Sequence, residues 1–367
     1  MPFQQAMKGY ALNMTIETFS RRRLLARASG LAIIALGSSN MLPALAATQL
    51  TGAGATFPYP FFSKAFYDYS QAHPDVTVNY QSIGSGGGIE QFTAKTVDFG
   101  ASDVPMNVDE LKRAEAGGAV VIQFATTLGG EAIAYNLPGA VKGGLHLTRE
   151  ALADIFLGKI TKWNDAALVK LNPGASLPNI PIVPVNRSDG SGTTYHFTDF
   201  LSHVSPEWKS KVGTGKSVQW PSPNSIGGKG NEGVAGQVTQ TPGAIGYVEL
   251  AYAIENKMTQ AMLQNKAGKW AICTANGAKA AAATKARISA TDFSIVDAAG
   301  PDSWPISGFS WGMVYEQPAD KSRAKMTQAV LLWLVTTAQP IAAALNYVAL
   351  PSNVQAYSKA QLGRMKV

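Results

Sequence analysis

The sequence predicts an α/β protein with a large buried core and roughly two domains. The chain has 367 residues, about twice the usual length of one domain. Apolar residues make up 46% of it and charged residues 15%, which excludes a disordered or strongly charged chain. Strand-like and helix-like segments alternate from Thr51 onward. Such alternation is typical of helices layered on a sheet with parallel strands.

The first 46 residues are interpreted as an export signal rather than as part of this fold. A basic cluster, Arg21–Arg23, precedes the short apolar run 28–36, and Ala44-Leu45-Ala46 is a small-x-small cleavage pattern. We therefore expect cleavage near Ala46. Ser20–Leu25 resembles a twin-arginine signal, with an ordinary secretory signal as the alternative. Met14 is an alternative start.

The predicted elements follow in chain order. Residue type and alternation predict strands at Val76–Tyr80, Ala119–Phe124 and Ile180–Val185. Apolar spacing predicts helices at Phe61–Gln71, Leu147–Phe156, 319–338 and 340–346, the last two separated by Pro340. Thr148 is the expected N-cap of the second helix and Gly158 its stop. The alanine-rich segment Ala275–Ala286 is predicted to be a surface helix or loop.

Charge and cysteine content exclude several kinds of site. The formal net charge is +7, but five basic residues and one acidic residue fall within the first 47 positions. The remainder has no basic stripe, so we expect no nucleic-acid partner. Cys273 is the only cysteine, which excludes an internal disulfide and a multi-cysteine metal site. No histidine pair has metal-binding spacing, so we expect no metal or cofactor, and a free buried thiol at Cys273.

Three turns of small residues each precede a predicted helix. They are Thr51–Phe57, Ile83–Gly88 and Arg187–Thr193. Small residues allow close approach of a ligand to the backbone, and a helix N-terminus presents unpaired N–H groups and partial positive charge. One such turn is usually only a helix cap, but three together, one of them carrying an arginine, indicate an oxyanion site.

Asp103 follows a short apolar stretch and lies in a turn of small residues. An aspartate near a proline is most often a turn former. The alternative is that Asp103 distinguishes phosphate from sulfate. Phosphate near neutral pH still carries a proton, and a carboxylate can accept a hydrogen bond from it. Sulfate has no such proton, and an unpaired buried carboxylate is costly.

Long motifs resemble those of the periplasmic phosphate-binding proteins of high-affinity phosphate ABC importers. The similarity extends over nearly the whole chain from Thr51. It is carried by TGAGATFP at 51–58, SIGSGGGIEQ at 82–91, VDFGASDVP at 97–105, NRSDGSGTT at 186–194 and PGAIGYVE at 242–249.

The resemblance implies a type II periplasmic binding-protein fold, with two α/β lobes and a ligand cleft between them. The first lobe would comprise 48–126 plus 301–367, and the second lobe 127–300. Hinge crossings would join the lobes.

The resemblance also implies a set of phosphate-binding residues. Ala55, Thr56 and Phe57 would offer backbone amides, with the Thr56 hydroxyl. Ser85 would donate through its amide and hydroxyl, and Asp103 would accept from the phosphate proton. From the second lobe, phosphate would be bound by Arg187, Ser191, Gly192 and Thr193. Asp189 would orient Arg187.

The predicted function is a non-enzymatic periplasmic receptor that binds inorganic phosphate reversibly. The family implies delivery to ABC permease subunits with a cytoplasmic ATPase, and we expect a monomer. Two alternatives stay open: an exported phosphatase or phosphoesterase, and a receptor for another oxyanion such as sulfate. The first would need a metal cluster or an activated nucleophile, and the sequence offers neither.

Overall fold

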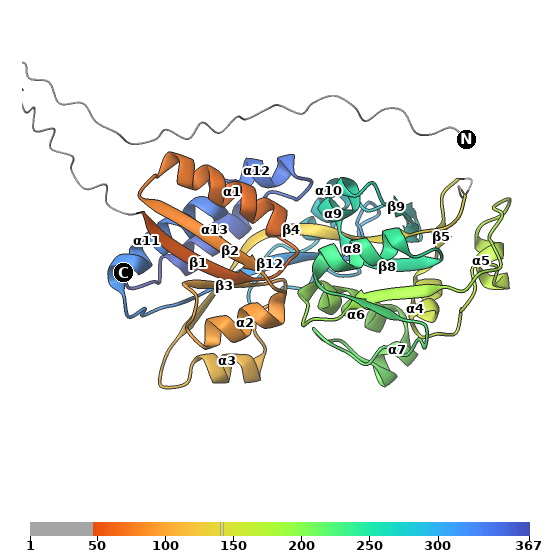
Figure 1. The fold of residues 1–367 in the computed structure, drawn as a ribbon, viewed down its shortest axis with the longest axis horizontal. Helices are drawn as coiled ribbons and strands as arrows, with labels where there is room; N and C mark the ends of the chain where they lie inside the picture. The colour runs from red at the N-terminus through yellow and green to blue at the C-terminus, as the bar shows by residue number, and fades with distance from the viewer. Residues whose placement is uncertain (1–46, 140, 142) are drawn as a thin grey trace, which may run out of the picture. The chain divides into compact units, whose positions relative to one another are not determined.

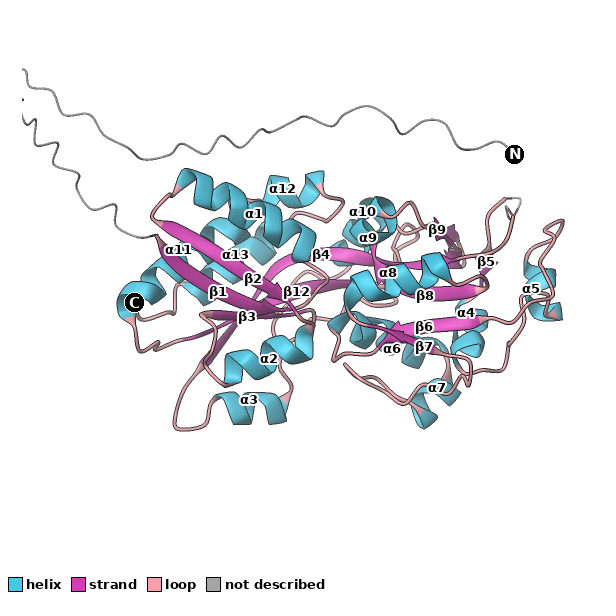
Figure 2. Ribbon diagram, in the orientation of Figure 1, coloured by secondary structure: helices cyan, strands magenta, loops and turns pink. Residues whose placement is uncertain are grey.

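The fold is an α/β arrangement in which one sheet continues from end to end (Figures 1 and 2). In the computed structural model, residues 47–139, 141 and 143–367 are described. The predicted export signal, its cleavage near Ala46 and the alternative start at Met14 lie outside these residues. The predicted α/β class is confirmed.

The strands have the following bounds: β1 (Thr48–Gly54), β2 (Val76–Ser82), β3 (Phe99–Ser102), β4 (Val121–Tyr135), β5 (His146–Leu147), β6 (Val183–Arg187), β7 (Ile226–Gly228), β8 (Ala244–Glu249), β9 (Thr259–Gln260), β10 (Met262–Gln264), β11 (Trp270–Ala271) and β12 (Ser307–Tyr315). The helices are α1 (Tyr59–Ala72), α2 (Ser85–Thr93), α3 (Val108–Ala114), α4 (Arg149–Phe156), α5 (Ala166–Leu171), α6 (Gly192–Val204), α7 (Pro206–Lys211), α8 (Gly230–Gln240), α9 (Leu250–Glu255), α10 (Ala275–Ala283), α11 (Lys321–Val335), α12 (Gln339–Ala344) and α13 (Ser352–Leu362).

Strand β4 connects the two halves of the large sheet, whose order is β2-β1-β3-β12-β4-β8-β6-β7. Its residues 121–130 pair antiparallel with β12, and its residues 131–135 pair antiparallel with β8. On either side of this antiparallel centre, β1, β2 and β3 are parallel, as are β6, β7 and β8. A short second sheet has the order β11-β10-β5.

Two large apolar clusters flank the crossing strand. The first core contains Phe61, Phe124, Trp311 and Leu334, and the second core contains Phe156, Trp163, Phe197 and Tyr247. Helices α1 and α11 pack on one face of β1–β3, with α12 against α1 and α13 against β4, and α2 and α3 lie on the other face (Figure 1). The fold is the two-lobe arrangement of type II periplasmic binding proteins.

Several local predictions are confirmed and two are refined. Thr148 caps α4 by accepting from the Ala151 amide at 3.1 Å, and Gly158 has a φ of +74° after it. Residues 275–283 form a helix whose Ala278 and Ala282 pack in the first core, because alanines four apart share one helix face. Pro340 lies in the first turn of α12, where its missing N–H costs nothing, rather than between two helices.

No helix among the described residues is long and apolar enough to cross a bilayer. Cys273 is a free, buried thiol, as predicted.

Candidate functional site

The candidate site lies where the loops that follow parallel strands converge. Strands β1, β2 and β3 run in one direction, so the segments after Gly54, Ser82 and Ser102 emerge at one sheet edge. The segments after β6 and β7 emerge together in the same way. Ligands of open α/β sheets bind at such carboxyl ends, where the strand order reverses.

The loop after β1 presents two amides that no acceptor among the described residues occupies, those of Thr56 and Phe57. Ala55 corrects the prediction, because its N–H donates to Ala101 O at 3.0 Å and is therefore not available to a ligand. Both Thr56 and Phe57 are buried.

Tyrosine hydroxyls hold three successive carbonyl groups of this loop. Tyr80 donates to Ala55 O at 2.8 Å, Tyr252 to Thr56 O at 2.6 Å and Tyr347 to Phe57 O at 2.6 Å. In a planar trans peptide the N–H points away from the preceding carbonyl. The first two hydroxyls therefore fix the directions of the Thr56 and Phe57 amides.

Ser85 and Asp103 meet at the same place. The Asp103 amide donates to Ser85 Oγ at 3.1 Å, and Ser85 Oγ lies 3.5 Å from Asp103 Oδ2. The Ser310 hydroxyl, on β12, donates to Asp103 Oδ1. Asp103 is about 1% exposed, and this burial raises its pKa to about 7, against the opposing effects of Ser310 and the Arg187 charge.

Arg187 ends β6 and is held by Asp189 two residues later. Its Nε donates to Asp189 Oδ1 at 2.8 Å and its Nη2 to Oδ2 at 2.6 Å, a two-point contact that fixes the guanidinium plane. Nη1 donates to Thr193 Oγ1 at 3.2 Å. These bonds use three of the five guanidinium N–H groups and leave two for a ligand.

Contacts between the loops bring the two sides of the site together. Gly86 N donates to Gly190 O at 2.9 Å, and Gly192 N donates to Ser85 Oγ at 3.0 Å. A Cβ at Gly192 would lie 2.4 Å from Asp103 Cβ, so only glycine fits. Ser191, next to it, caps α6 by accepting from the Thr194 amide at 3.0 Å.

Residues 43–338 match the model of the PBP superfamily domain. The phosphate-binding protein PstS of Xylella fastidiosa (strain Temecula1 / ATCC 700964) is 48% identical over 308 residues, covering 83% of this chain and 82% of the relative. The phosphate-binding protein PstS of Methanocaldococcus jannaschii is 39% identical, covering 86% of each. The chain belongs to the PstS phosphate-binding protein family.

Solved structures agree with this fold. A human phosphate binding apolipoprotein has a TM-score of 0.69 at 22% identity, covering 85% of this chain and 93% of that one. A phosphate binding protein from Stenotrophomonas maltophilia has a TM-score of 0.66 at 19% identity, covering 86% and 94%. At these identities the likeness concerns the fold.

The site of this PstS-family chain includes polar residues that the sequence did not reveal. Asn231 donates from its backbone N and its Nδ2 to Thr56 Oγ1, at 3.1 and 2.8 Å. Predicted site residues are also contacted by Tyr80, Tyr252, Tyr347 and Ser310, as described above. Asn231 lies in GGKGNEG at 227–233, whose glycines predict a loop that packs on the cleft or hinge, but no local pattern indicates a contact 175 residues away.

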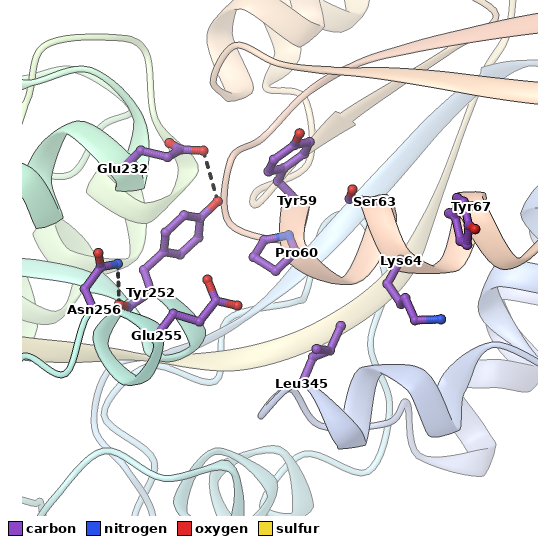
Figure 3. A pocket seen from close by; sticks show the side chains of 10 residues that line it. All are labelled: Tyr59, Pro60, Ser63, Lys64, Tyr67, Glu232, Tyr252, Glu255, Asn256 and Leu345. Atoms are coloured by element: carbon purple, nitrogen blue, oxygen red, sulfur yellow. Dashed lines mark hydrogen bonds between the residues drawn. The ribbon is translucent and has the colours of Figure 1, made fainter. Parts of the chain in front are cut away.

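A surface pocket of about 620 Å³ lies beside this PstS-family site but does not contain it. Figure 3 shows Tyr59, Pro60 and Lys64 of α1 facing Tyr252 and Glu255 of α9 across it. Two of its lining residues also contact the Thr56 loop by hydrogen bonds, because the Tyr252 hydroxyl and the Tyr59 amide both donate to Thr56 O, at 2.6 and 3.2 Å. The predicted binding residues are buried where the loops touch, and none of them lines the open pocket.

Proposed function

We propose that this protein is a periplasmic receptor that binds inorganic phosphate reversibly between two lobes and delivers it to an ABC importer. The observation that carries the proposal is one buried carboxylate, Asp103, amid hydrogen-bond donors. The donors are the amides of Thr56, Phe57, Ser85 and Thr193, the hydroxyls of Thr56, Ser85, Ser191 and Thr193, and two N–H groups of Arg187. Gly192 lines the site, and Asp189 orients Arg187.

This arrangement matches a protonated tetrahedral anion. Phosphate oxygens accept hydrogen bonds from the N–H and O–H groups, while the phosphate proton is donated to Asp103. Sulfate would place an oxygen without a proton against that carboxylate. The names of the curated relatives, phosphate-binding protein PstS, support phosphate as the ligand.

We propose that the first lobe comprises 48–126 with 301–367 and the second 127–300. In this scheme α10 belongs to the second lobe by sequence and contributes Ala278 to the first core. Phosphate favours closure because only the closed arrangement offers donors from both lobes at once. The proposal also includes signal cleavage near Ala46, a periplasmic location and action as a monomer. Its partners are permease subunits and a cytoplasmic ATPase.

The competing function is an exported phosphatase with the same oxyanion site. Hydrolysis would need an activated nucleophile. Within the described residues, the hydroxyls of Thr56, Ser85, Ser191 and Thr193 hydrogen-bond to no histidine. Helix α6 contains two histidines: His203 contacts Asp199 O at 2.8 Å, and His196 contacts Glu131 at 3.1 Å, with burial lowering the pKa of His196 to about 4.

Calorimetric titration of the purified protein with phosphate tests the proposal, with sulfate as competitor and a phosphomonoester as a possible substrate. We expect saturable phosphate binding, weak competition by sulfate and no turnover. The Asp103→Asn variant should narrow the preference for phosphate over sulfate, because an amide can also donate to sulfate. Turnover of the ester, or equal affinity of the unaltered protein for both anions, would contradict the proposal.

A further inference from the structure

Three hydroxyl groups at the site share one unusual property: each accepts two hydrogen bonds from N–H groups. Ser85 Oγ accepts from the amides of Asp103 and Gly192, at 3.1 and 3.0 Å. The other two hydroxyls belong to threonines that Asn231 contacts. A hydroxyl has one proton and two lone pairs, so an oxygen that accepts twice can only donate in its remaining hydrogen bond.

Asn231 donates both hydrogen bonds that the Thr56 hydroxyl accepts and one of the two that the Thr193 hydroxyl accepts. Thr56 Oγ1 accepts from Asn231 N at 3.1 Å and from Asn231 Nδ2 at 2.8 Å. Thr193 Oγ1 accepts from Arg187 Nη1 at 3.2 Å and from Asn231 Nδ2 at 3.4 Å. Asn231 is fully buried, so water does not replace these donors.

The orientation of the Asn231 amide follows from its third partner. The Glu249 backbone N–H lies 2.9 Å from Asn231 Oδ1. A backbone N–H can only donate, so the side-chain oxygen must be on that side. The amide NH₂ group therefore faces the two threonine hydroxyls, where it can only donate.

We propose that Asn231 is a positioning residue that fixes the hydroxyls of Thr56 and Thr193 as donors to the bound phosphate when the lobes close. This inference rests on the proposed function. Ser85 is already fixed by the two amides, and its one proton, which in this structure is donated to Asp103 Oδ2 over 3.5 Å, turns to the ligand when phosphate is bound. All three hydroxyls then donate to the ligand, and Asp103 is left as the acceptor for the phosphate proton.

Closure and hydroxyl polarity are coupled in this arrangement. Thr56 belongs to the first lobe, whereas Asn231 lies in the first turn of α8, whose Val234 and Ala235 pack in the second core. In an open form the Thr56 hydroxyl is free to accept from water or to donate. Closure brings both N–H groups of Asn231 to Thr56 Oγ1 and removes that freedom.

A purely structural role makes a different prediction. Asn231 also ties α8 to β8 through Glu249, and loss of that tie alone would weaken binding by loosening the second lobe. Such an effect would be independent of whether residue 56 has a hydroxyl. A double-mutant cycle between positions 231 and 56 separates the two roles.

The experiment compares phosphate affinity by calorimetry in the unaltered protein, Asn231→Ala, Thr56→Val and the double variant, with thermal unfolding of each free protein. We expect each single substitution to weaken binding about tenfold or more, as for a hydrogen bond to a charged ligand. The fold-loss of phosphate affinity caused by Asn231→Ala should be at least about threefold smaller in the Thr56→Val background than in the unaltered protein. The inference would be overturned if Asn231→Ala reduced phosphate affinity as much in the Thr56→Val background as it does alone. Unchanged affinity of the Asn231→Ala variant would overturn it as well.

Asn231→Asp provides a second test. It keeps the size of the side chain and an acceptor for the Glu249 amide, but its other oxygen accepts from Thr56 and turns that hydroxyl away from phosphate. We expect a greater loss than for Asn231→Ala. Asn136→Asp, whose native Nδ2 bonds to Thr239 O, adds the same charge away from the site and should change affinity less than about twofold.

Near-native phosphate affinity of Asn231→Asp would overturn the inference, as would an equal loss in Asn136→Asp. If Asn231→Asp fails to fold, the cycle with Thr56→Val decides alone. Failure of the unaltered protein to bind phosphate would instead refute the proposed function, so the two failures are distinguishable.

Discussion

Asp103 is a buried carboxylate among donors, and its environment fixes the ionisation of the empty site. Burial favours the neutral acid, whereas the Ser310 hydroxyl and Arg187 favour the charged form. The result is a pKa of about 7, far above the ordinary value of 3.8. A carboxyl group in this range can exchange a proton with phosphate at little cost in free energy.

The raised pKa predicts how stability depends on pH. Between pH 4 and 7 the folded protein retains a proton on Asp103 that the unfolded chain has released. The protonated Asp103 therefore contributes stability that is complete below pH 4 and is lost as pH rises through 7. The Asp103→Asn variant has no titrating group at this position, so it does not lose this contribution to stability as pH rises. Between pH 5 and 7, its free energy of unfolding should rise relative to that of the unaltered protein by about 2 to 3 kcal/mol.

Denaturant unfolding of the two phosphate-free proteins at pH 5, 6, 7 and 8 measures this difference. His196, Glu131 and Glu249 are present in both proteins, so burial affects their titration in both. The Asp103 charge also raises the pKa of Glu131 and Glu249, so the difference between the curves includes this coupling. A difference that does not change with pH would show that Asp103 has an ordinary pKa.

Helix α6 shows how one element serves both the fold and the site. Ser191 stands at its N-cap, and the segment 191–193 faces the loops of the first core. The cap bond to the Thr194 amide uses a lone pair of the Ser191 hydroxyl and leaves its proton for a ligand. Ser205 caps α7 in the same manner, with Oγ 3.2 Å from the Trp208 amide, but lies outside the site.

This pair of caps provides a matched comparison. Ser191→Ala and Ser205→Ala should each lower the free energy of unfolding by about 0.5 to 2 kcal/mol through loss of the cap. Only Ser191→Ala should also weaken phosphate binding, by about tenfold, through loss of a donor to the anion. Denaturant unfolding and calorimetry measure the two effects, and equal affinities in the two variants would exclude Ser191 from the site.

The sequence predicted local elements better than long-range contacts. The cap at Thr148 and the stop at Gly158 depend on neighbouring residues, so they were predictable. Strand β4 extends eleven residues past the predicted Phe124, because its small residues and glycines lack a strand pattern and only pairing with β12 and β8 defines it. Asn231 and Tyr252 were missed because their partner, Thr56, is 175 and 196 residues away in the sequence.

At the scale of the whole molecule, the two halves are connected by continuous strands and by contacts between their loops. Tyr252 and Asn231 both reach Thr56, and Lys216 lies 2.6 Å from Glu110 across the same boundary. Close approach of Gly192 to Asp103 requires that position 192 have no side chain. This contact between the two halves is therefore sensitive to a single methyl group.

Gly192→Ala should prevent full closure while leaving each core intact. The added Cβ would lie 2.8 Å from Asp103 Cα and N as well as 2.4 Å from its Cβ, too close to be accommodated without separating the loops. We expect phosphate affinity to fall by about 100-fold or more. Solution scattering should show compaction on phosphate addition in the unaltered protein but not in this variant.

Gly236→Ala is the control for this test, because a Cβ there meets nothing within 4 Å. It adds the same methyl group to helix α8, where alanine is favoured over glycine. Its affinity and compaction should match those of the unaltered protein. Full affinity in Gly192→Ala would mean that phosphate is bound without close contact between the loops.

The position of β12 in the large sheet has a consequence for biogenesis. This strand, residues 307–315, lies between β3 and β4, and helices α11 to α13 follow it. On the ribosome, the half that is begun first is thus the half that is finished last. Until residues beyond 307 emerge, strands β1 to β3 have an unpaired edge and an uncovered apolar face, so nascent chains need protection from aggregation until translation is nearly over.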